Sequence, residues 1–227
     1  MRITQRDIRL VKDIGLSHLL SRDQVINLGF FGSVTRANTR LRELGALQLV
    51  KSLKTPYFGQ NLYMPGPRAQ KVVGDRISAL IRARAGSPRF IQHALAVTDT
   101  RIALLKKPER VWKFEQQARA IFHVGSKPYE VRPDGIVSSR EKMLVVEVDL
   151  GHVSRSEFAL KLDAYNAFIA SGACNLNWKV PTFQVLTVTT GSQRASTLKE
   201  LVPDNCCFAF NCATFEDLEI RTPGGWS

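Results

Sequence analysis

The chain has 227 residues, of which 44% are hydrophobic and 23% charged, and its formal net charge is +12. This length can hold one large domain or two modest ones, and the composition is that of a globular protein. No apolar run approaches the length of a membrane span, we recognise no signal peptide, and the four cysteines lack CxxC spacing, so we expect a cytoplasmic protein.

The positive charge is concentrated in the first part of the chain. Residues 1–87 contain 15 Lys/Arg and 5 Asp/Glu, a formal charge of +10, whereas residues 88–227 contain 17 and 15, a charge of +2. A basic segment on a near-neutral remainder indicates a polyanionic partner. A membrane surface would also suit the charge, but the segment lacks a strongly amphipathic basic helix, so nucleic acid is favoured.

The first 65 residues have the pattern of a winged helix-turn-helix. Apolar spacing predicts helices over residues 4–17, 21–30 and 34–47, with Thr4 and Ser21 as N-caps and Gly45 as a C-terminal cap. Residues 47–53 and 60–65 read as the two strands of a wing. We therefore predict a DNA-binding domain over residues 1–66.

The third predicted helix and the wing carry the side chains that suit DNA. Arginine, lysine, asparagine and threonine contact phosphates and base edges. The candidate DNA-binding residues are Arg36, Asn38, Thr39, Arg40, Arg42, Lys51 and Lys54. The alternative is a winged helix used for dimerisation, which the local charge disfavours.

A connecting helix over residues 68–85, within a linker of residues 67–87, precedes the second predicted domain, 88–227. There the spacing predicts helices over 90–107, 111–122, 157–170 and 192–202, and strands over 182–190 and 206–215. A β-hairpin of residues 136–138 and 143–149 lies between the second and third of these helices. The fold class is therefore α/β (α+β) with a mixed sheet.

The hairpin is the most informative segment. Its polar tip at residues 139–142 places Asp134 nearly opposite Glu147, and alternation along the strand puts Asp149 on the same face as Glu147. Three close carboxylates repel one another unless a cation neutralises them, and oxygen ligands suit Mg²⁺ or Mn²⁺. We therefore predict a metal site made by Asp134, Glu147 and Asp149.

The alternative is that Pro133-Asp134-Gly135 forms a turn and that the strand's acids face solvent. The strand is apolar on both sides of Glu147, as a strand buried on both faces would be. Buried acids are costly unless they are paired or metal-bound, which favours the metal site.

The order of these residues resembles the PD-(D/E)XK nuclease superfamily. Pro133-Asp134 matches the PD, and Glu147-Val148-Asp149 stands where Glu-x-Lys is usual, so that Asp149 replaces the lysine. Some members carry the lysine on the following helix, where Lys161 lies. Glu115 matches the acidic residue often found on the first core helix. The resemblance thus implies a restriction-endonuclease-like domain with these residues as its catalytic set.

A longer pattern resembles the replication-relaxation family, which includes plasmid mobilisation proteins of the MobC relaxase type. It comprises the winged helix, residues 93–99 (HALAVTD), 133–135 (PDG), 147–151 (EVDLG), and Lys161 with Tyr165. The resemblance implies metal-dependent nicking of double-stranded DNA, such as a plasmid origin. A homodimer and mobilisation or replication proteins are further candidate partners.

The chemistry expected of these residues is phosphodiester hydrolysis. Asp134 and Glu147 would hold one or two divalent ions, with Asp149 or Glu115 completing the coordination. Lys161 would orient the nucleophile or stabilise the phosphorane. Tyr165, one turn further on the same helix face, is a nucleophile candidate if the mechanism is covalent, and otherwise packs or binds phosphate. The rival function is a non-catalytic replication or transcription regulator whose nuclease-like core is a scaffold, which the missing Glu-x-Lys lysine favours.

Overall fold

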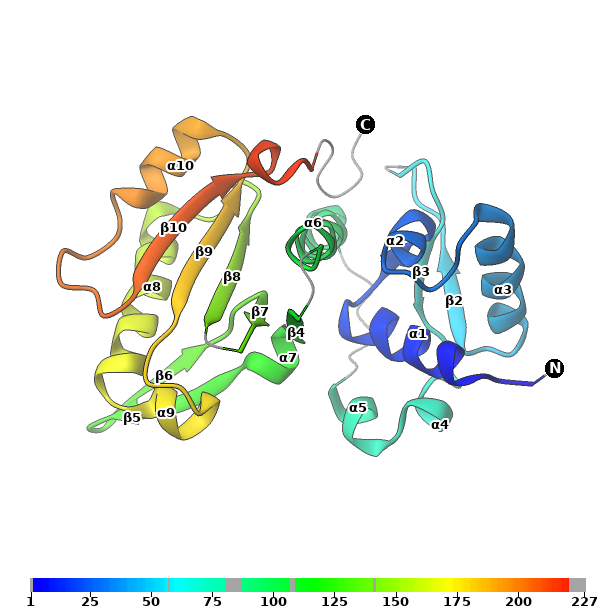
Figure 1. Cartoon of the computed structure of the whole chain (residues 1–227), viewed down its shortest axis with the longest axis horizontal. Helices are drawn as coiled ribbons and strands as arrows, with labels where there is room; N and C mark the ends of the chain where they lie inside the picture. Colours follow the sequence, from blue (N-terminus) through cyan, green and yellow to red (C-terminus); the bar gives the residue numbers. More distant parts are fainter. Residues whose placement is uncertain (1, 57, 81–86, 107–108, 141, 221–227) are drawn as a thin grey trace. The chain divides into compact units, whose positions relative to one another are not determined.

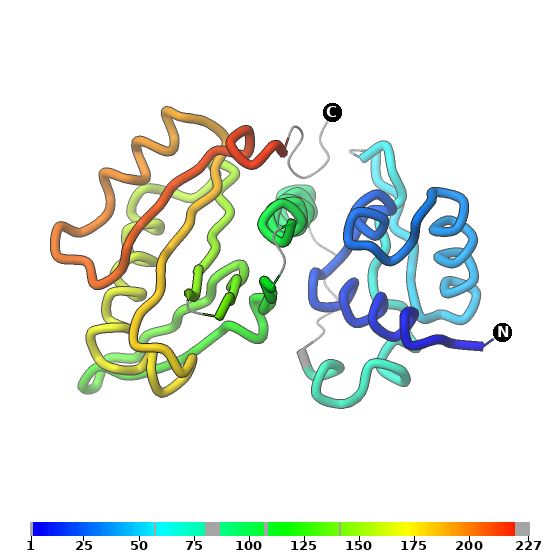
Figure 2. The backbone as a smooth tube through the Cα atoms, viewed as in Figure 1, coloured from blue at the N-terminus to red at the C-terminus, as the bar shows by residue number. Residues whose placement is uncertain are grey.

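The computed structural model describes residues 2–56, 58–80, 87–106, 109–140 and 142–220. Two compact units divide between Ile102 and Ala103, and each is described separately below (Figures 1 and 2). This division lies later in the chain than the predicted boundary at residue 88. No helix in the described part is both long enough and apolar enough to cross a membrane.

The first unit combines helices with a small antiparallel sheet. Its elements are α1 (Gln5–Leu16), β1 (Leu20–Ser21), α2 (Arg22–Asn27), α3 (Val34–Ala46), β2 (Val50–Leu53), β3 (Leu62–Pro65), α4 (Gln70–Val73), α5 (Asp75–Leu80) and most of α6 (Pro88–Leu104). The strand order is β1-β3-β2, with both pairs antiparallel. The three helices and the two strands that the sequence predicts within residues 1–65 are present.

Local signals fix where these helices begin. The predicted N-caps Thr4 and Ser21 both form capping boxes, which satisfy backbone N–H groups that the first helical turn leaves unpaired. The predicted C-cap at Gly45 is wrong, because Gly45 lies inside α3 and Gln48 takes the left-handed conformation after it. The single helix predicted over 68–85 is also wrong. Gly74, with φ +79°, separates α4 from α5, and residues 81–86 lie outside the described part.

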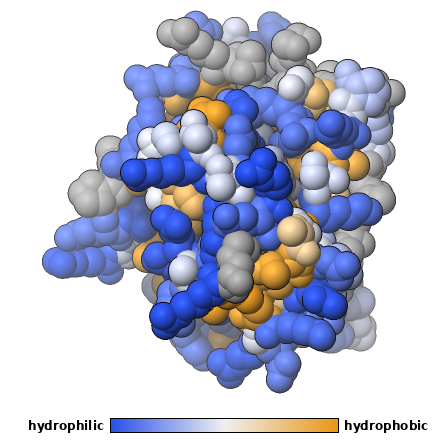
Figure 3. Space-filling view, turned by 90° about the vertical axis from the view of Figure 1, so that its right-hand side faces the viewer, coloured by the Kyte–Doolittle hydropathy of each residue, from blue (hydrophilic) through white to orange (hydrophobic). Residues whose placement is uncertain are grey.

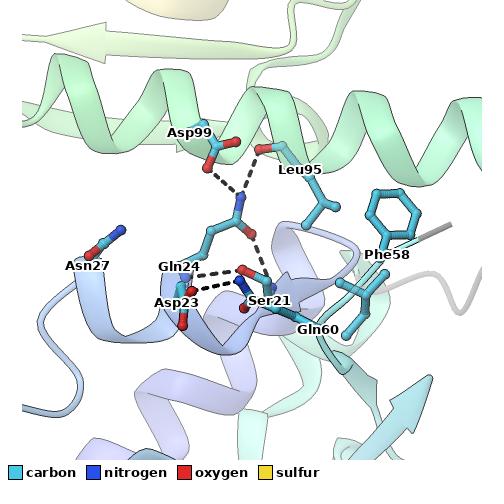
Figure 4. Close-up of a pocket in the computed structure, with 9 residues that line it drawn as sticks. Ser21, Asp23, Gln24, Asn27, Phe58, Gln60, Leu95 and Asp99 are labelled. Atoms are coloured by element: carbon cyan, nitrogen blue, oxygen red, sulfur yellow. Dashed lines mark hydrogen bonds between the residues drawn. The ribbon is translucent and has the colours of Figure 1, made fainter. Parts of the chain in front are cut away.

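Helix α6 is fastened to the three-helix part of the first unit by polar contacts. The Arg101 guanidinium donates to both carboxylate oxygens of Asp13 on α1, at 2.5 and 2.7 Å. The buried Gln24 side chain on α2 donates to the Leu95 carbonyl at 2.9 Å and to Asp99 at 2.7 Å (Figure 4). Through these bonds most of α6 belongs to the first unit. The sequence pattern places this helix in the second predicted domain instead.

The second unit is a mixed sheet with helices packed on it. Its elements are β4 (Val111–Phe114), α7 (Glu115–Ala118), β5 (Ala120–Val124), β6 (Lys127–Val131), β7 (Gly135–Ser138), β8 (Met143–Asp149), α8 (Arg155–Ala170), α9 (Ala173–Trp178), β9 (Gln184–Thr189), α10 (Ser192–Lys199), β10 (Ala209–Thr214) and a short 3₁₀ turn (Glu216–Leu218). The five-stranded sheet has the order β10-β9-β8-β7-β4, and β5 and β6 form a separate ribbon. Strands β8, β9 and β10 are parallel. Their connections through α8 and α10 run the same way along the sheet, so right-handed crossovers put both helices on one face (Figure 1).

The helix predicted over residues 111–122 is wrong. This segment forms β4, the single turn α7 and β5 instead. The Trp112 ring lies over the backbone of Gly135, where an added Cβ would come within 2.0 Å of it. An aromatic side chain that packs across a neighbouring strand favours the extended conformation over the helical one.

The predicted hairpin and its register are confirmed. Strands β7 and β8 pair antiparallel with Gly135 opposite Val146, so Asp134 follows directly opposite Glu147. Helix α8 covers this part of the sheet. Its side chains Phe158, Leu162, Tyr165 and Phe168 are buried, whereas Ile169 is only partly buried. The hairpin and α8 therefore hold the predicted acidic residues against a packed core.

Candidate acidic site and nucleic-acid face

One row of side chains crosses the sheet of the second unit on the face covered by α8. The pairing of Phe114 with Gly135 puts Glu115 beside Asp134, and Asp134 faces Glu147 across the hairpin. On the other side, Glu147 is paired in parallel register with Thr187. Neighbouring strands lie ~4.8 Å apart, so adjacent members of this row are within reach of one another.

Glu147 is the centre of the row. It is 2% exposed, and each carboxylate oxygen accepts a hydrogen bond from α8. The Lys161 ammonium donates to Oε2 at 2.5 Å, and the Tyr165 hydroxyl donates to Oε1. Lys161 does reach the acidic row from the helix, and its side chain stays 39% exposed, so it can also be approached from solvent.

The pKa values of Glu147 and Lys161 are both raised, and the balance between burial and neighbouring charges sets each shift. Burial raises the pKa of Glu147 to about 7; the nearby Asp134 charge adds to this rise and the Lys161 ammonium opposes it. For Lys161, burial favours the neutral amine, but the charges of Glu147 and Asp134 outweigh it and raise the pKa. Lys161 is therefore a cation at neutral pH, and Glu147 binds a proton more readily than an ordinary carboxylate.

Asp134 lies between Glu115 and Glu147 in the row and is half-buried. Its Oδ2 accepts a hydrogen bond from the Val148 backbone N–H at 2.7 Å, which ties the Pro133-Asp134-Gly135 turn to β8. This bond holds the Asp134 carboxylate against β8 at the residue that follows Glu147.

Asp149 is held by a different set of partners. Although it lies on the same face as Glu147, its carboxylate accepts bonds from Arg194 Nε at 2.7 Å and Nη2 at 3.1 Å, and from Thr189 Oγ1 at 2.8 Å. Arg194 comes from α10 and also donates to the Val153 carbonyl at 2.7 Å. The arrangement makes Asp149 part of a clamp that joins the ends of β8 and β9 to α10.

The remaining predicted residues occupy distinct positions. Glu115, predicted on a core helix, begins the short α7, and Arg132 binds its carboxylate. The Tyr165 ring is fully buried, and burial together with the Glu147 charge raises the pKa of its hydroxyl. A buried phenol already bonded to a carboxylate is poorly placed to attack a phosphate.

A divalent metal can be fitted to these residues only in part. Across the described ranges, no group of three or more His, Cys, Asp or Glu side chains could hold a metal ion. Asp134 and Glu147 remain as neighbouring oxygen donors, and Mg²⁺ is commonly held by one or two carboxylates with water completing the shell. The donor set therefore suits a two-carboxylate site, without Asp149.

Sequence reasoning missed Thr187, Arg194 and Arg132. Arg194 lies 45 residues from Asp149, and no local pattern marks it as that residue's partner. Thr187 and Thr189 lie in a strand rich in β-branched residues. Threonine is common in strands because of its β-propensity, so its presence there does not indicate a functional role. Arg132 directly precedes the Pro-Asp pair, and this adjacency was the one available signal.

In the first unit, α3 and the segment of β2 and the residue after it present the predicted DNA-binding side chains to solvent. Exposed residues among them are Arg36, Asn38, Thr39, Arg42, Lys51 and Lys54. Figure 3 shows the side of the molecule seen at the right of Figure 1, and hydrophilic residues cover most of it, with hydrophobic residues gathered in smaller areas. The exposed cations Arg36, Arg42, Lys51 and Lys54 suit a polyanion.

Arg40 differs from its neighbours on α3. Its guanidinium donates to both oxygens of Asp7 on α1, at 2.9 and 2.6 Å, and to Glu43 at 2.6 Å. Asp7 is fully buried, and it also accepts bonds from the Thr4 backbone N–H and hydroxyl. Arg40 thus links α3 to α1. The sequence predicted a DNA contact for Arg40 and did not predict this structural role.

Comparison with known proteins gives one family and one weak structural likeness. The model of the family described as replication-relaxation matches residues 12–182. A crystal structure of protein VC1899 from Vibrio cholerae is similar over 100% of this chain and 59% of that chain, with 8% sequence identity and a TM-score of 0.36. No curated protein matches the chain.

Proposed function

Because the chain belongs to the replication-relaxation family, we propose that it is a DNA-binding, metal-dependent nicking enzyme or endonuclease that acts in the replication or mobilisation of a plasmid or other mobile element. The observation that carries the proposal is the contact of Lys161 with Glu147, beside Asp134. Two carboxylates that can hold a divalent ion, and a lysine that can stabilise negative charge on a phosphate, are groups that support phosphodiester hydrolysis.

The first unit would supply DNA affinity. Its order of helix, strand, helix, helix, strand, strand supports a winged helix-turn-helix, with α3 as the helix that enters the major groove. Arg36 and Arg42 are exposed on α3, and Lys51 and Lys54 on the wing. Phosphate contacts by these cations release counterions, which gives affinity that falls steeply with salt.

The second unit would supply the chemistry. A bound Mg²⁺ or Mn²⁺ polarises the scissile phosphate and lowers the pKa of a water ligand. Asp134 and Glu147 would hold that ion, while Lys161 stabilises negative charge on the pentacoordinate phosphorus or orients the attacking water. The supply of lysine from α8 supports a PD-(D/E)XK-like core in which Asp149 has a structural task. The burial of Tyr165 supports hydrolysis rather than a covalent tyrosine intermediate.

A cleavage assay on supercoiled plasmid tests the proposal. With Mg²⁺ or Mn²⁺ the protein should convert supercoiled DNA into open-circular or linear product, and a chelator should abolish the reaction. Asp134→Asn should be inactive, whereas Asp163→Asn, which changes an exposed carboxylate on α8, should be active. Inactive wild type on supercoiled, linear and single-stranded DNA with both metals would reject an enzymatic function.

The second candidate is a non-catalytic replication or transcription regulator with the same DNA-binding unit. Two observations favour it: Asp149 stands in place of the usual lysine, and protein donors engage both oxygens of Glu147. In that case the wild type would bind duplex DNA and leave it intact under all the conditions of the cleavage assay.

A further inference from the structure

Strands β8 and β9 place two carboxylates opposite two threonines in equivalent positions. Glu147 is paired with Thr187 and Asp149 with Thr189 in the same parallel register, and all four side chains lie on the face covered by α8 and α10. The two pairs therefore differ in side-chain length and neighbours rather than in backbone geometry.

The second pair shows that this geometry permits a hydrogen bond across the strands. Thr189 Oγ1 donates to Asp149 Oδ2 at 2.8 Å. In the first pair, Thr187 is 0% exposed and its hydroxyl has no hydrogen-bond partner among the described residues. A buried hydroxyl without a hydrogen bond destabilises the folded state, so the absence of a bond at Thr187 needs a physical reason.

The Glu147 carboxylate is bonded to helix α8 instead of to Thr187 on the neighbouring strand. Lys161 and Tyr165 draw Glu147 toward α8, one on each oxygen. Glutamate has one more methylene than aspartate, so its carboxylate can move between the helix and the neighbouring strand by rotation about its side-chain bonds. The Thr187 hydroxyl lies on the strand side of that movement.

We infer that Thr187 is a positioning residue for Glu147, whose hydroxyl donates to the carboxylate when Lys161 leaves it. The departure of Lys161 rests on the proposed function, in which the Lys161 ammonium turns from Glu147 to the phosphate. Thr187 then keeps the Glu147 carboxylate hydrogen-bonded and oriented toward Asp134. Its hydroxyl would donate to Glu147 in the same way that the Thr189 hydroxyl donates to Asp149.

A double-mutant cycle on the full chain tests this without DNA or metal. The variants are Thr187→Val, Lys161→Met and the two together, with the melting temperature measured at one fixed pH. In the native background, Thr187→Val should leave the melting temperature unchanged or raise it, because it removes an unsatisfied hydroxyl. In the Lys161→Met background, the same change should lower it by several degrees, because Thr187 has become the donor to Glu147.

Thr187→Ser is the matched control, since it keeps the hydroxyl and should not lower the melting temperature further in the Lys161→Met background than in the native one. Equal effects of Thr187→Val in the two backgrounds would overturn the inference. So would a large fall in the native background, which would mean that the hydroxyl is already in use.

Mn²⁺ titration of the same proteins separates this inference from the proposed function. Partners that orient a metal ligand typically contribute about 10–100-fold in affinity, so Thr187→Val should weaken Mn²⁺ binding by that factor. Coupling in the melting experiment without any Mn²⁺ binding by the wild type would keep the positioning role and reject the metal site. Mn²⁺ binding by the wild type without coupling in the melting experiment would support the metal site and reject the positioning role of Thr187.

Discussion

The two units each contain a buried carboxylate paired with a cation, and the two pairs have opposite properties. Asp7 is fully buried against Arg40, and its pKa is lowered to about 2: burial alone would raise it, but the hydrogen bonds from Arg40 and Thr4 outweigh that effect. Glu147 is buried against Lys161, and burial raises its pKa to about 7.

The difference comes from what else surrounds each carboxylate. Asp7 has a bidentate guanidinium and two Thr4 donors around it, so every nearby group favours the anion. Glu147 has one ammonium and the Tyr165 hydroxyl as donors, and its burial together with the neighbouring Asp134 carboxylate disfavours its charged form. A carboxylate with surplus donors is a fixed structural anion, whereas one beside another acid retains affinity for a further cation, which is the property a metal site needs.

The largest effect is expected from removing the cation of the second pair. Lys161→Met should lower the rate of plasmid cleavage by on the order of 10²–10³-fold, as loss of a charge-stabilising group does elsewhere. DNA affinity in a gel-shift assay should stay unchanged, because the cations proposed to contact DNA lie in the first unit. Lys142→Met, which alters an exposed lysine at the hairpin tip, is the control and should cleave normally. Full activity of Lys161→Met would make Lys161 a structural cation like Arg40.

Removing the cation of the first pair should affect stability instead. Arg40→Ala leaves a buried, unpaired Asp7, and breaking such a pair costs about 3–5 kcal/mol. Denaturant unfolding should report this loss in the free energy of unfolding. Arg36→Ala, on an exposed position of the same helix, should change stability by less than ~0.5 kcal/mol. Similar stabilities for the two variants would contradict a structural role for Arg40.

The pH dependence of stability should have opposite signs for the two carboxylates. The folded-state pKa of Glu147 lies above its ordinary value of 4.5, so its contribution is fully present below pH 4.5 and is lost as the pH rises through about 7, by about 3 kcal/mol. Glu147→Gln should remove that loss in unfolding experiments between pH 5 and pH 8. Asp7, with its lowered pKa, contributes stability that is present above pH 3.8 and lost as the pH falls through about 2. An unchanged pH profile in Glu147→Gln would show that Glu147 titrates normally.

A smaller effect is expected at the exposed cations of α3. Replacing Arg36 and Arg42 with alanine should weaken duplex-DNA binding by roughly tenfold and reduce the salt slope by about 2, since each phosphate contact contributes about 0.9. Fluorescence anisotropy across a salt series measures both quantities. Arg68→Ala, an exposed arginine outside α3 and the wing, should leave the slope unchanged. A double variant with the wild-type slope would place the DNA contacts on another surface.

The sequence was sufficient where the signal was local. Pairing about a polar tip gave the register that sets Asp134 opposite Glu147, because side-chain alternation and a short turn leave little freedom. Apolar spacing predicted the helix over residues 157–170, which buries Phe158 and Leu162, and Lys161 on this helix reaches the acidic row, as the resemblance to nucleases implied.

The sequence was insufficient where partners lie far apart in the chain. Arg40 looks like a DNA contact until Asp7, 33 residues earlier, is seen beneath it. Asp149 looks like a metal ligand until Arg194 is seen to bind it. Residues 111–114 have apolar spacing compatible with either secondary structure, and the choice depends on Trp112 packing across Gly135.

Asp134 and Glu147 are proposed to bind a divalent metal ion together. Calorimetric titration with Mn²⁺ tests this central claim most directly. The wild type should bind Mn²⁺ more tightly at pH 8 than at pH 6, because a proton on Glu147 competes with the metal. Asp134→Asn and Glu147→Gln should each abolish binding while the folded state persists. Absence of Mn²⁺ binding by the wild type at both pH values, with and without duplex DNA, would contradict the account.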